Sequence, residues 1–436
     1  MKVKNYRWII VTLLFTGTVI NYLDRQVIGL LKPTLEVEFN WSETDFGSLM
    51  SAFSFAYAIG LLISGKFIDK VGTKIGYSVS VIVWSIAGMF HAAARSVTGF
   101  GIARASLGIG EAGNFPAAVK AVSEWFPRKE RGLATGIFNS GTAVGSVLAL
   151  ILVPLIMQDY GWKGVFVITG ALGFVWLAFW LIFYEIPSRQ KRLTNEELLY
   201  IEGDNDDETG TQVESKNSAS WYKLFSLPQT WAVITGKLLI DPIFWFFGIW
   251  LPSYFSAAFN LNLKVISPEL LIIYGATIIG SIAGGYLSSV LIKKGWPTLR
   301  ARKSVLLFVA ILELIIMIAI ARFVTDKWVA VGLISIAVAV HQAWATNIFT
   351  MASDMFPKEV VSSVVGIAGM SGAIGGILFP LLVGQILDVY KAGGNLTGGY
   401  NVIFTICGVT YFIAWIIIHL LTKKFTKALI PQPGLK

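Results

Sequence analysis

Twelve apolar segments recur along the chain, each long enough to cross a lipid bilayer as a helix. A helix needs about 20 mainly apolar residues to cross a hydrocarbon core of roughly 30 Å. Because 55% of the residues are apolar and only 14% are charged, the chain is predicted to be an all-α polytopic membrane protein. The predicted spans are 8–31, 47–68, 76–94, 97–120, 132–156, 163–185, 229–256, 268–292, 302–323, 328–352, 361–387 and 400–422.

These spans form two sets of six, separated by the longest polar stretch of the sequence. We expect an N-terminal six-helix bundle over 1–185, a cytoplasmic linker over 186–228, and a C-terminal six-helix bundle with a cytoplasmic tail over 229–436. Within the linker, TNEELLYIE predicts a short surface helix. The GDNDDETGTQVESKNSAS stretch that follows has the low hydrophobicity of a flexible strap.

The distribution of Lys and Arg predicts the orientation in the membrane. With a cytoplasmic N-terminus, 24 of the 35 Lys and Arg residues lie in cytoplasmic segments, 7 in outer loops and 4 within spans. The positive-inside rule therefore predicts that both termini are cytoplasmic. The net charge of +9 reflects this topology and not nucleic-acid binding. The first span is long, contains the polar NYLDR and lacks a small-residue cleavage site, so it is expected to remain as a helix.

Cysteine and histidine indicate no covalent or metal chemistry. Cys407 is the only cysteine, so no intramolecular disulfide can form. The three histidines stand far apart without metal-ligand spacing, and no metal or cofactor is expected. No edge of a span gathers a nucleophile, a base and metal ligands, so the sequence does not indicate an enzyme.

One motif occurs in both halves at a constant offset of 230 residues. SEWFPRKERGLATGIFNSGTAVGS (123–146) aligns without a gap with SDMFPKEVVSSVVGIAGMSGAIGG (353–376). Six is an even number of spans, so both copies enter the membrane from the same side. Parallel repeats of this kind predict a binding site between the halves near mid-membrane.

Four stretches carry a family resemblance. GKFIDKVGTK (65–74), after the second span, resembles the Gly-x-x-x-Asp-Arg/Lys-x-Gly-x-Arg/Lys loop signature of the major facilitator superfamily, although its second copy, GGYLSSVLIKKG (284–295), has serine in place of the acid. NYLDR, ARASLGIGEAGNFPA (103–117) and SEWFP are similar to the anion:cation symporter family, whose members include bacterial hexuronate and galactonate importers.

The loop signature also predicts a cytoplasmic gate. Gly65, Asp69 and Gly72 are its characteristic residues. Close approach of helices needs glycine, and an acid there can cap a helix or pair across the gate. Their expected role is conformational, not substrate binding.

Two arginines lie at similar depths in the first half. Arg25 precedes Lys32, at the outer end of its span, by seven residues, and Arg104 follows Arg95, at the outer start of the fourth span, by nine. At about 1.5 Å per residue these depths are similar. A charge at the bilayer centre costs roughly 2.5–3.5 kcal/mol on translocon scales. Two guanidinium groups at one level could clamp a carboxylate; alternatively, each pairs with a neighbouring acid and only holds helices together.

Two carboxyl groups are candidates for proton coupling. Glu111 lies about two turns inward from Arg104 on roughly the same helix face. A lone carboxyl group there can bind and release a proton near neutral pH. The family resemblance implies this role for Glu111 and also for Asp24. The alternative for either acid is to remain permanently ionised beside an arginine.

Other polar residues within spans are candidates for substrate contact. Tyr22 and Tyr57 resemble family tyrosines that hydrogen-bond the substrate. In HQAWATNIF, His341 matches the position of Glu111 at the repeat offset. Amides and an indole could contact sugar hydroxyl groups and an apolar sugar face, whereas helix packing is the alternative for each residue. The candidate substrate-binding residues are Arg25, Arg104, Tyr22, Tyr57, Asn139, His341, Trp344 and Asn347.

Three charged residues in the second half receive no functional assignment. Lys237 and Asp241 are spaced i, i+4, which predicts a local ion pair. Glu313 stands alone in ILELIIMIAI, and the sequence indicates no role for it.

Together these features predict a secondary transporter in which two bundles rock around a central site, giving alternating access. The residues themselves indicate a proton-coupled anion carrier. The resemblance implies a bacterial inner-membrane importer of a hexuronate such as galacturonate or glucuronate, with a eukaryotic vesicular location as the alternative. We expect it to work as a monomer with the organic anion, protons and the lipid bilayer as partners, and not to bind nucleic acid. Other sugar acids (galactonate, glucarate, sialate) and phosphate or organophosphate exchange are alternatives, although Glu111 counts against an exchanger. A receptor or sensor is also possible, but a 43-residue linker is short for a signalling module.

Overall fold

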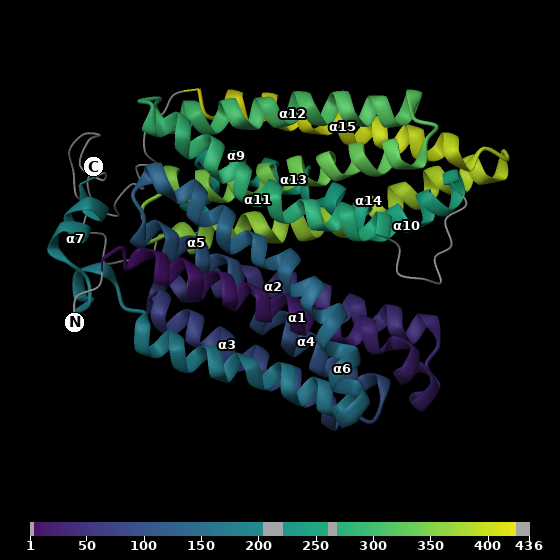
Figure 1. Ribbon diagram of the computed structural model, residues 1–436, viewed down its shortest axis with the longest axis horizontal. Coiled ribbons are helices and arrows are strands. Elements are labelled where there is room, and N and C mark those ends of the chain that lie inside the picture. Colours follow the sequence, from purple (N-terminus) through teal and green to yellow (C-terminus); the bar gives the residue numbers. More distant parts are fainter. Residues whose placement is uncertain (1–3, 204–220, 260–267, 424–436) are drawn as a thin grey trace. The chain divides into compact units, whose positions relative to one another are not determined.

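The computed structural model describes residues 4–203, 221–259 and 268–423, and all regular elements in these ranges are helices (Figure 1). The chain divides into two compact units. Unit 1 comprises Met1–Ser220 and Phe356–Met370, and unit 2 comprises Trp221–Met355 and Ser371–Lys436. Each unit is described by itself.

Unit 1 is a bundle in which α1 packs against α6, α2 against α4, and α3 against both α4 and α6. The first residues of α14 (Val361–Ala392) also belong to it. Its other helices are α1 (Arg7–Phe39), α2 (Glu43–Val71), α3 (Thr73–Phe90), α4 (Val97–Glu111), α5 (Asn114–Trp125), α6 (Arg128–Phe183), α7 (Asn195–Glu202) and the 3-10 turns η1 (His91–Ala93) and η2 (Pro187–Arg189).

Two helix boundaries in unit 1 differ from the predicted spans. The span predicted over 97–120 is divided between α4 and α5, which are separated directly after Glu111. By contrast, α6 continues through both 132–156 and 163–185, but Gly161 within it has a φ of 62°. A positive φ is accessible to glycine without steric cost. Gly161 therefore marks the turn between two spans, as the sequence predicted.

Unit 2 is a second bundle, in which α11 packs against α13 and α12 packs against α15 and α13 (Figure 1). The span predicted over 229–256 is divided into α9 and α10, and Pro242 occupies the first turn of α10, where a proline is tolerated. The helices are α8 (Trp221–Phe225), α9 (Pro228–Leu238), α10 (Asp241–Phe259), α11 (Pro268–Lys293), α12 (Thr298–Phe323), α13 (Lys327–Met355), the remainder of α14 and α15 (Leu396–Leu421).

Nine helical segments of the described chain are long and apolar enough to cross a membrane. One of them, α6, contains two predicted spans. The two predicted spans outside the nine form α1, which carries the polar NYLDR, and the α4–α5 pair. Every predicted span is therefore helical, which confirms the all-α polytopic fold.

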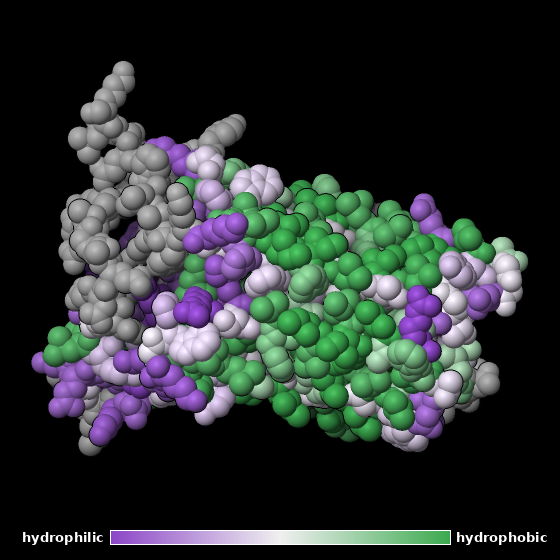
Figure 2. Space-filling model, turned by 90° about the horizontal axis from the view of Figure 1, so that it is seen from above, coloured by the Kyte–Doolittle hydropathy of each residue, from purple (hydrophilic) through white to green (hydrophobic). Residues whose placement is uncertain are grey.

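Large apolar side chains are exposed on both units, and Figure 2 shows them gathered in broad fields apart from the hydrophilic side chains. Ile63 and Ile86 in unit 1 are 55% and 53% exposed, and Ile279 and Leu381 in unit 2 are 70% and 63% exposed. Apolar patches of this extent are typical of surfaces that contact lipid.

The polar linker contains the short helix expected from TNEELLYIE. Thr194 caps α7 by accepting a hydrogen bond from the Glu197 backbone N–H. Arg7, at the start of α1, pairs with Glu197 and with Glu130, each at 2.8 Å, and so joins α7 to α1 and α6. The predicted flexible strap, 204–220, lies outside the described residues.

Candidate functional site

The polar NYLDR stretch of α1 lies inside unit 1. Asn21 and Asp24 are buried there. Gly145 of α6 packs so closely on α1 that a Cβ atom would lie 3.0 Å from the Cβ of Tyr22. Small residues allow this close approach of helices in a membrane. The glycine-rich run of α6, which also carries the buried Asn139, therefore packs on α1 beside Tyr22.

Arg25 is held between an acid and three aromatic rings. Its Nε donates a hydrogen bond to Glu111 Oε2 at 2.8 Å, and the Glu111 side chain is completely buried. The guanidinium carbon lies 4.6 Å from the ring centres of both Tyr22 and Tyr57 and 5.1 Å from that of Phe53. Such cation–π contacts stabilise a desolvated guanidinium group. Arg25 thereby links α1 with α2 and α4.

Arg104, on α4, contacts Phe53, which is one of the three rings around Arg25. Its guanidinium carbon lies 4.3 Å from the ring centre of Phe53, and the residue is 1% exposed. One guanidinium nitrogen approaches the sulfur of Met50 at 3.8 Å. Since Arg25 also contacts Phe53, the structure brings the two predicted arginines together on one ring.

Several buried polar atoms of α1 and α4 have no hydrogen-bond partner among the described residues. Buried polar groups are normally paired, so each exception requires an explanation. Binding of an anion and of protons would supply partners for these donors and acceptors. The atoms are Nδ2 and Oδ1 of Asn21, both carboxyl oxygens of Asp24, one Nη of Arg25, Nε of Arg104 and Oε1 of Glu111.

Asp24 does not pair with Arg25, although the two are adjacent in sequence. Consecutive helical residues do not face each other, and Asp24 instead points towards α6, where Thr169 lies beside it outside hydrogen-bond geometry. Asp24 and Glu111 are close enough to interact electrostatically. Asn21, to which the sequence interpretation gave no role, shares the α1 face of Asp24 three residues away.

The three candidates on α13 lie in unit 2 and are buried. The Nδ1 atom of His341 lies 2.5 Å from the Tyr411 hydroxyl oxygen, and the ring of His341 stacks on Phe244. Trp344 donates its indole N–H to the Gly236 carbonyl at 3.1 Å. Asn347 donates to the carbonyls of Gly284 and Ala343 at 3.0 and 2.9 Å, whereas its Oδ1 accepts no hydrogen bond within the part of the chain that the structure describes. Trp344 and Asn347 thus use their side-chain N–H donors in hydrogen bonds to helix backbones.

The acid of the loop signature, Asp69, makes two kinds of contact within unit 1. It pairs with Lys120 at 2.8 Å, and it accepts hydrogen bonds from the backbone N–H groups of Ser362 and Ser363 in the first turn of α14. Carboxylates stabilise helix N-termini in this way. The sequence interpretation assigned no role to Lys120.

The two glycines of the loop signature, Gly65 and Gly72, occupy positions that disfavour a side chain. A Cβ atom on Gly65 would lie 3.1 Å from the Cα of Ser363, so only glycine permits this packing. Gly72 has a φ of 86° and separates α2 from α3. A side chain at either position would be disfavoured.

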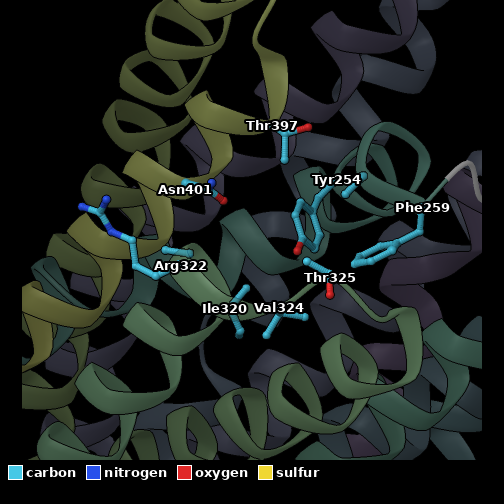
Figure 3. A pocket seen from close by; sticks show the side chains of 10 residues that line it. Tyr254, Phe259, Ile320, Arg322, Val324, Thr325, Thr397 and Asn401 are labelled. Carbon is cyan, nitrogen blue, oxygen red and sulfur yellow. The ribbon is translucent and has the colours of Figure 1, made fainter.

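The predicted ion pair of unit 2 is confirmed: Lys237 Nζ lies 2.6 Å from Asp241 Oδ2. Unit 2 also contains a cavity of about 450 Å³ where α10 and α12 end and α15 begins (Figure 3). None of the candidate residues lines it. Its polar lining includes Tyr254, Arg322, Thr325, Thr397 and Asn401.

A helical membrane protein that buries arginines and carboxyl groups inside its bundle has the construction of a secondary transporter, because such groups mark ion and substrate pathways. Residues 14–380 match the sequence model described as the Major Facilitator Superfamily. The chain belongs to the Major Facilitator Superfamily.

Known relatives agree with this assignment. The chain is 34% identical to the hexuronate transporter of Escherichia coli (strain K12), over 94% of this chain and 92% of that protein. It is 35% identical to the galacturonate transporter of Dickeya chrysanthemi, over 66% and 82%. The solved structure of the proton:xylose symporter XylE bound to 6-bromo-6-deoxy-D-glucose shares the fold, with a TM-score of 0.74, 16% identity and 97% coverage of both chains. These relatives confirm the family resemblance and a transport protein, not an enzyme.

Proposed function

We propose that the protein imports an organic monoanion together with protons, and that the anion is a hexuronate such as galacturonate or glucuronate. The observation that carries this proposal is the Arg25–Glu111 pair together with the buried Nε of Arg104, which has no hydrogen-bond partner among the described residues. The hexuronate and galacturonate transporters to which the chain is similar support the choice of substrate. Galactonate, glucarate and sialate are the alternatives among sugar acids.

The Arg25–Glu111 pair provides a physical means of coupling proton binding to anion binding. When Glu111 is ionised it neutralises Arg25, and when Glu111 binds a proton the guanidinium group is left with uncompensated charge. A substrate carboxylate then replaces Glu111 as the partner of Arg25, with Arg104 donating from the other side. Release of the proton restores the Arg25–Glu111 pair and displaces the anion. Anion and proton thus bind together because each removes the electrostatic cost of the other.

Asp24 provides a second proton-binding group. Its two carboxyl oxygens accept no hydrogen bond from the described residues, and it interacts electrostatically with Glu111. Tyr22 and Tyr57, which flank Arg25, offer hydroxyl groups to the same anion, and Asn139 of α6 offers an amide.

In unit 2, His341, Trp344 and Asn347 are proposed to contact the sugar. His341 and the Oδ1 of Asn347, which no described residue hydrogen-bonds, offer polar contacts, and the indole face of Trp344 offers an apolar one. Gly65, Asp69 and Gly72 form the proposed cytoplasmic gate. We further propose that the protein is a monomer in the bacterial inner membrane with both termini in the cytoplasm, as the distribution of Lys and Arg predicts.

The substrate class is tested by uptake of labelled galacturonate into proteoliposomes under an inward proton gradient. Unlabelled glucuronate, galactonate, sialate and glucose 6-phosphate serve as competitors. We expect accumulation that collapses with a protonophore and is inhibited most strongly by glucuronate. Exchange of phosphorylated compounds without gradient-driven uptake of any sugar acid would instead establish the antiporter alternative.

A further inference from the structure

The helix that carries Glu111 is interrupted directly after this residue. A proline has no backbone N–H, so Pro116 cannot donate to the carbonyl of Ala112 four residues earlier, and the helical hydrogen-bond pattern is broken there. The Ala112 carbonyl instead accepts a hydrogen bond from the Ser64 hydroxyl of α2 at 3.2 Å. The break between α4 and α5 is therefore set by the sequence, and the carbonyl that it frees is satisfied by a neighbouring helix.

Neighbouring helices pack closely around this break. A Cβ atom on Gly113 would lie 2.8 Å from the Cβ of Ser80 in α3. On the side of α2, a Cβ atom on Gly60 would lie 2.9 Å from the Cβ of Ala112. Glycine permits both contacts. The break is thus enclosed by α2 and α3, and it cannot shift without moving them.

Asn114, the first residue of α5, connects the break to α1 and α3. The Tyr77 hydroxyl of α3 donates to its Oδ1 at 2.5 Å, and its Nδ2 donates to the Thr18 hydroxyl oxygen of α1 at 3.4 Å. Thr18 in turn donates to the Leu14 carbonyl at 2.9 Å. Asn114, Tyr77 and Thr18 are completely buried. A buried chain in which each hydroxyl and amide has its partner holds its members in one arrangement.

The same two parts of the bundle also meet at the proposed proton-coupling pair. Arg25 lies seven residues after Thr18 on α1, and Glu111 lies three residues before Asn114. Seven helical residues are about two turns, so Thr18 and Arg25 share one face of α1. The α4–α5 segment is therefore attached to this face twice, by the ion pair of Arg25 and by the amide of Asn114. The first attachment depends on a proton and the second does not, because neither an amide nor a hydroxyl group titrates near neutral pH.

We propose that Asn114 is a positioning residue that keeps Glu111 aligned with Arg25 while the pair opens and closes. When Glu111 binds a proton and Arg25 binds the anion, the neutral hydrogen bonds of Asn114 hold the helix break in place. Glu111 then meets Arg25 again when it releases its proton, and the anion is displaced. Without these hydrogen bonds the pair re-forms less completely, so the anion stays bound more tightly when Glu111 is ionised. This inference rests on the proposed function of the Arg25–Glu111 pair.

The charged and titratable groups around Glu111 belong to α1, α2 and α4. Tyr77→Phe and Thr18→Val each remove one hydrogen bond of Asn114 and leave all of these groups in the chain. A changed pH dependence in either variant therefore reports on the position of Glu111 and not on a lost charge. The groups are Arg25, Asp24, Arg104, and the two tyrosines that contact Arg25, Tyr22 and Tyr57.

The test is the pH dependence of KM for galacturonate counterflow in Tyr77→Phe and Thr18→Val. In the wild type, KM should rise with pH, because the ionised acid competes with the anion for Arg25. Loss of one hydrogen bond should lower KM at the alkaline end of the profile by about fivefold and so flatten this rise. Thr18→Ser, which keeps the hydroxyl group, should restore the wild-type profile. Thr12→Val, which removes only a hydroxyl bond within α1, is the matched control and should leave the profile unchanged.

Two results would overturn the proposal. Profiles of Tyr77→Phe and Thr18→Val that follow the wild type, even with a lower Tm, would make Asn114 a packing residue. Effects on KM that persist in full after Glu111→Gln is added would show that they do not act through the Arg25–Glu111 pair.

A readout that needs no substrate separates these outcomes from failure of the proposed function. In infrared difference spectra, the carbonyl band that Glu111→Gln removes should persist to a pH higher by about 0.7 unit in Tyr77→Phe than in the wild type, which is the same fivefold change. This shift supports the role of Asn114 even if no sugar acid is transported. A Glu111 band that titrates identically in the two proteins contradicts it, whatever the substrate.

Discussion

Asp69 and Ser363, separated by 294 positions in the sequence, are joined by two hydrogen bonds to one carboxylate oxygen: the Ser363 backbone N–H donates at 2.7 Å and its hydroxyl at 2.6 Å. The acid of the loop signature therefore caps the first turn of α14 while it pairs with Lys120. One side chain connects three helices, so a change in its charge affects all three.

Replacing Asp69 by Asn should lower both stability and transport. The amide keeps one acceptor for the α14 N-terminus but removes the ion-pair partner of the buried Lys120, and breaking a buried pair costs about 3–5 kcal/mol. We expect a clear fall in Tm in detergent and a lower uptake rate. Asp45→Asn, which alters the exposed cap of α2, is the control and should shift Tm much less. Equal shifts in the two variants would contradict this account of Asp69.

Replacing Arg25 by Lys should weaken substrate binding although the charge is retained. Lysine lacks the planar fork that donates to a carboxylate, and it stacks less well between Tyr22 and Tyr57. Loss of charge-assisted hydrogen bonds worth about 1.5–3 kcal/mol corresponds to about a 10- to 100-fold higher KM. The exposed Arg95 provides the control variant Arg95→Lys. An unchanged KM in Arg25→Lys would show that Arg25 only holds helices together.

The predictions from sequence succeeded where short-range pattern decides the structure. Runs of apolar residues identified every span. Polar residues within the spans singled out Arg25, Arg104 and Glu111; the structure pairs Arg25 with Glu111 and places both arginines on Phe53, and their role in transport stays a prediction. The partners of these residues were not predictable, because pairing depends on how helices pack. Glu111 is 86 positions from Arg25, and no local spacing relates them.

Sequence reasoning also could not distinguish contact with substrate from contact with a neighbouring helix. The donors of Trp344 and Asn347 reach backbone carbonyls of α9 and α11 as well as of α13 itself, which no side-chain pattern reveals. Asn114 received no role because its partners, Thr18 and Tyr77, come from α1 and α3. In both cases the missing information is the packing of helices that are distant in the chain.

Trp344→Phe should separate the two roles of Trp344. Phenylalanine keeps an aromatic face for the sugar but loses the hydrogen bond to the Gly236 carbonyl, which contributes about 1 kcal/mol to folding. We expect a lower Tm with KM nearly unchanged, whereas Trp344→Ala should also raise KM. If Trp344→Ala lowers Tm without altering KM, the indole is a packing residue and is removed from the proposed site.

Lys358, between α13 and α14, should make the stability of the folded protein vary with pH in the alkaline range. Burial and repulsion by Arg131 lower the pKa of its ammonium group, despite attraction by Glu124, Glu359 and Glu202. The folded state therefore binds this proton less tightly than the unfolded state does, and stability rises as pH increases from the lowered pKa towards the usual 10.5. Lys358→Gln should raise Tm at neutral pH, and its advantage should shrink as pH approaches about 10. The exposed Lys294→Gln is the control, and a pH-independent advantage of Lys358→Gln would contradict the prediction.

The central claim is that Glu111 couples proton binding to the anion held by Arg25. The most direct measurement is transport of labelled galacturonate by Glu111→Gln in proteoliposomes, both as counterflow and as uptake driven by an inward proton gradient. The account predicts that counterflow persists, because Arg25 remains free to bind the anion, whereas accumulation driven by the gradient is lost. Accumulation at the wild-type level in Glu111→Gln would contradict the account and would leave Glu111 as a structural partner of Arg25.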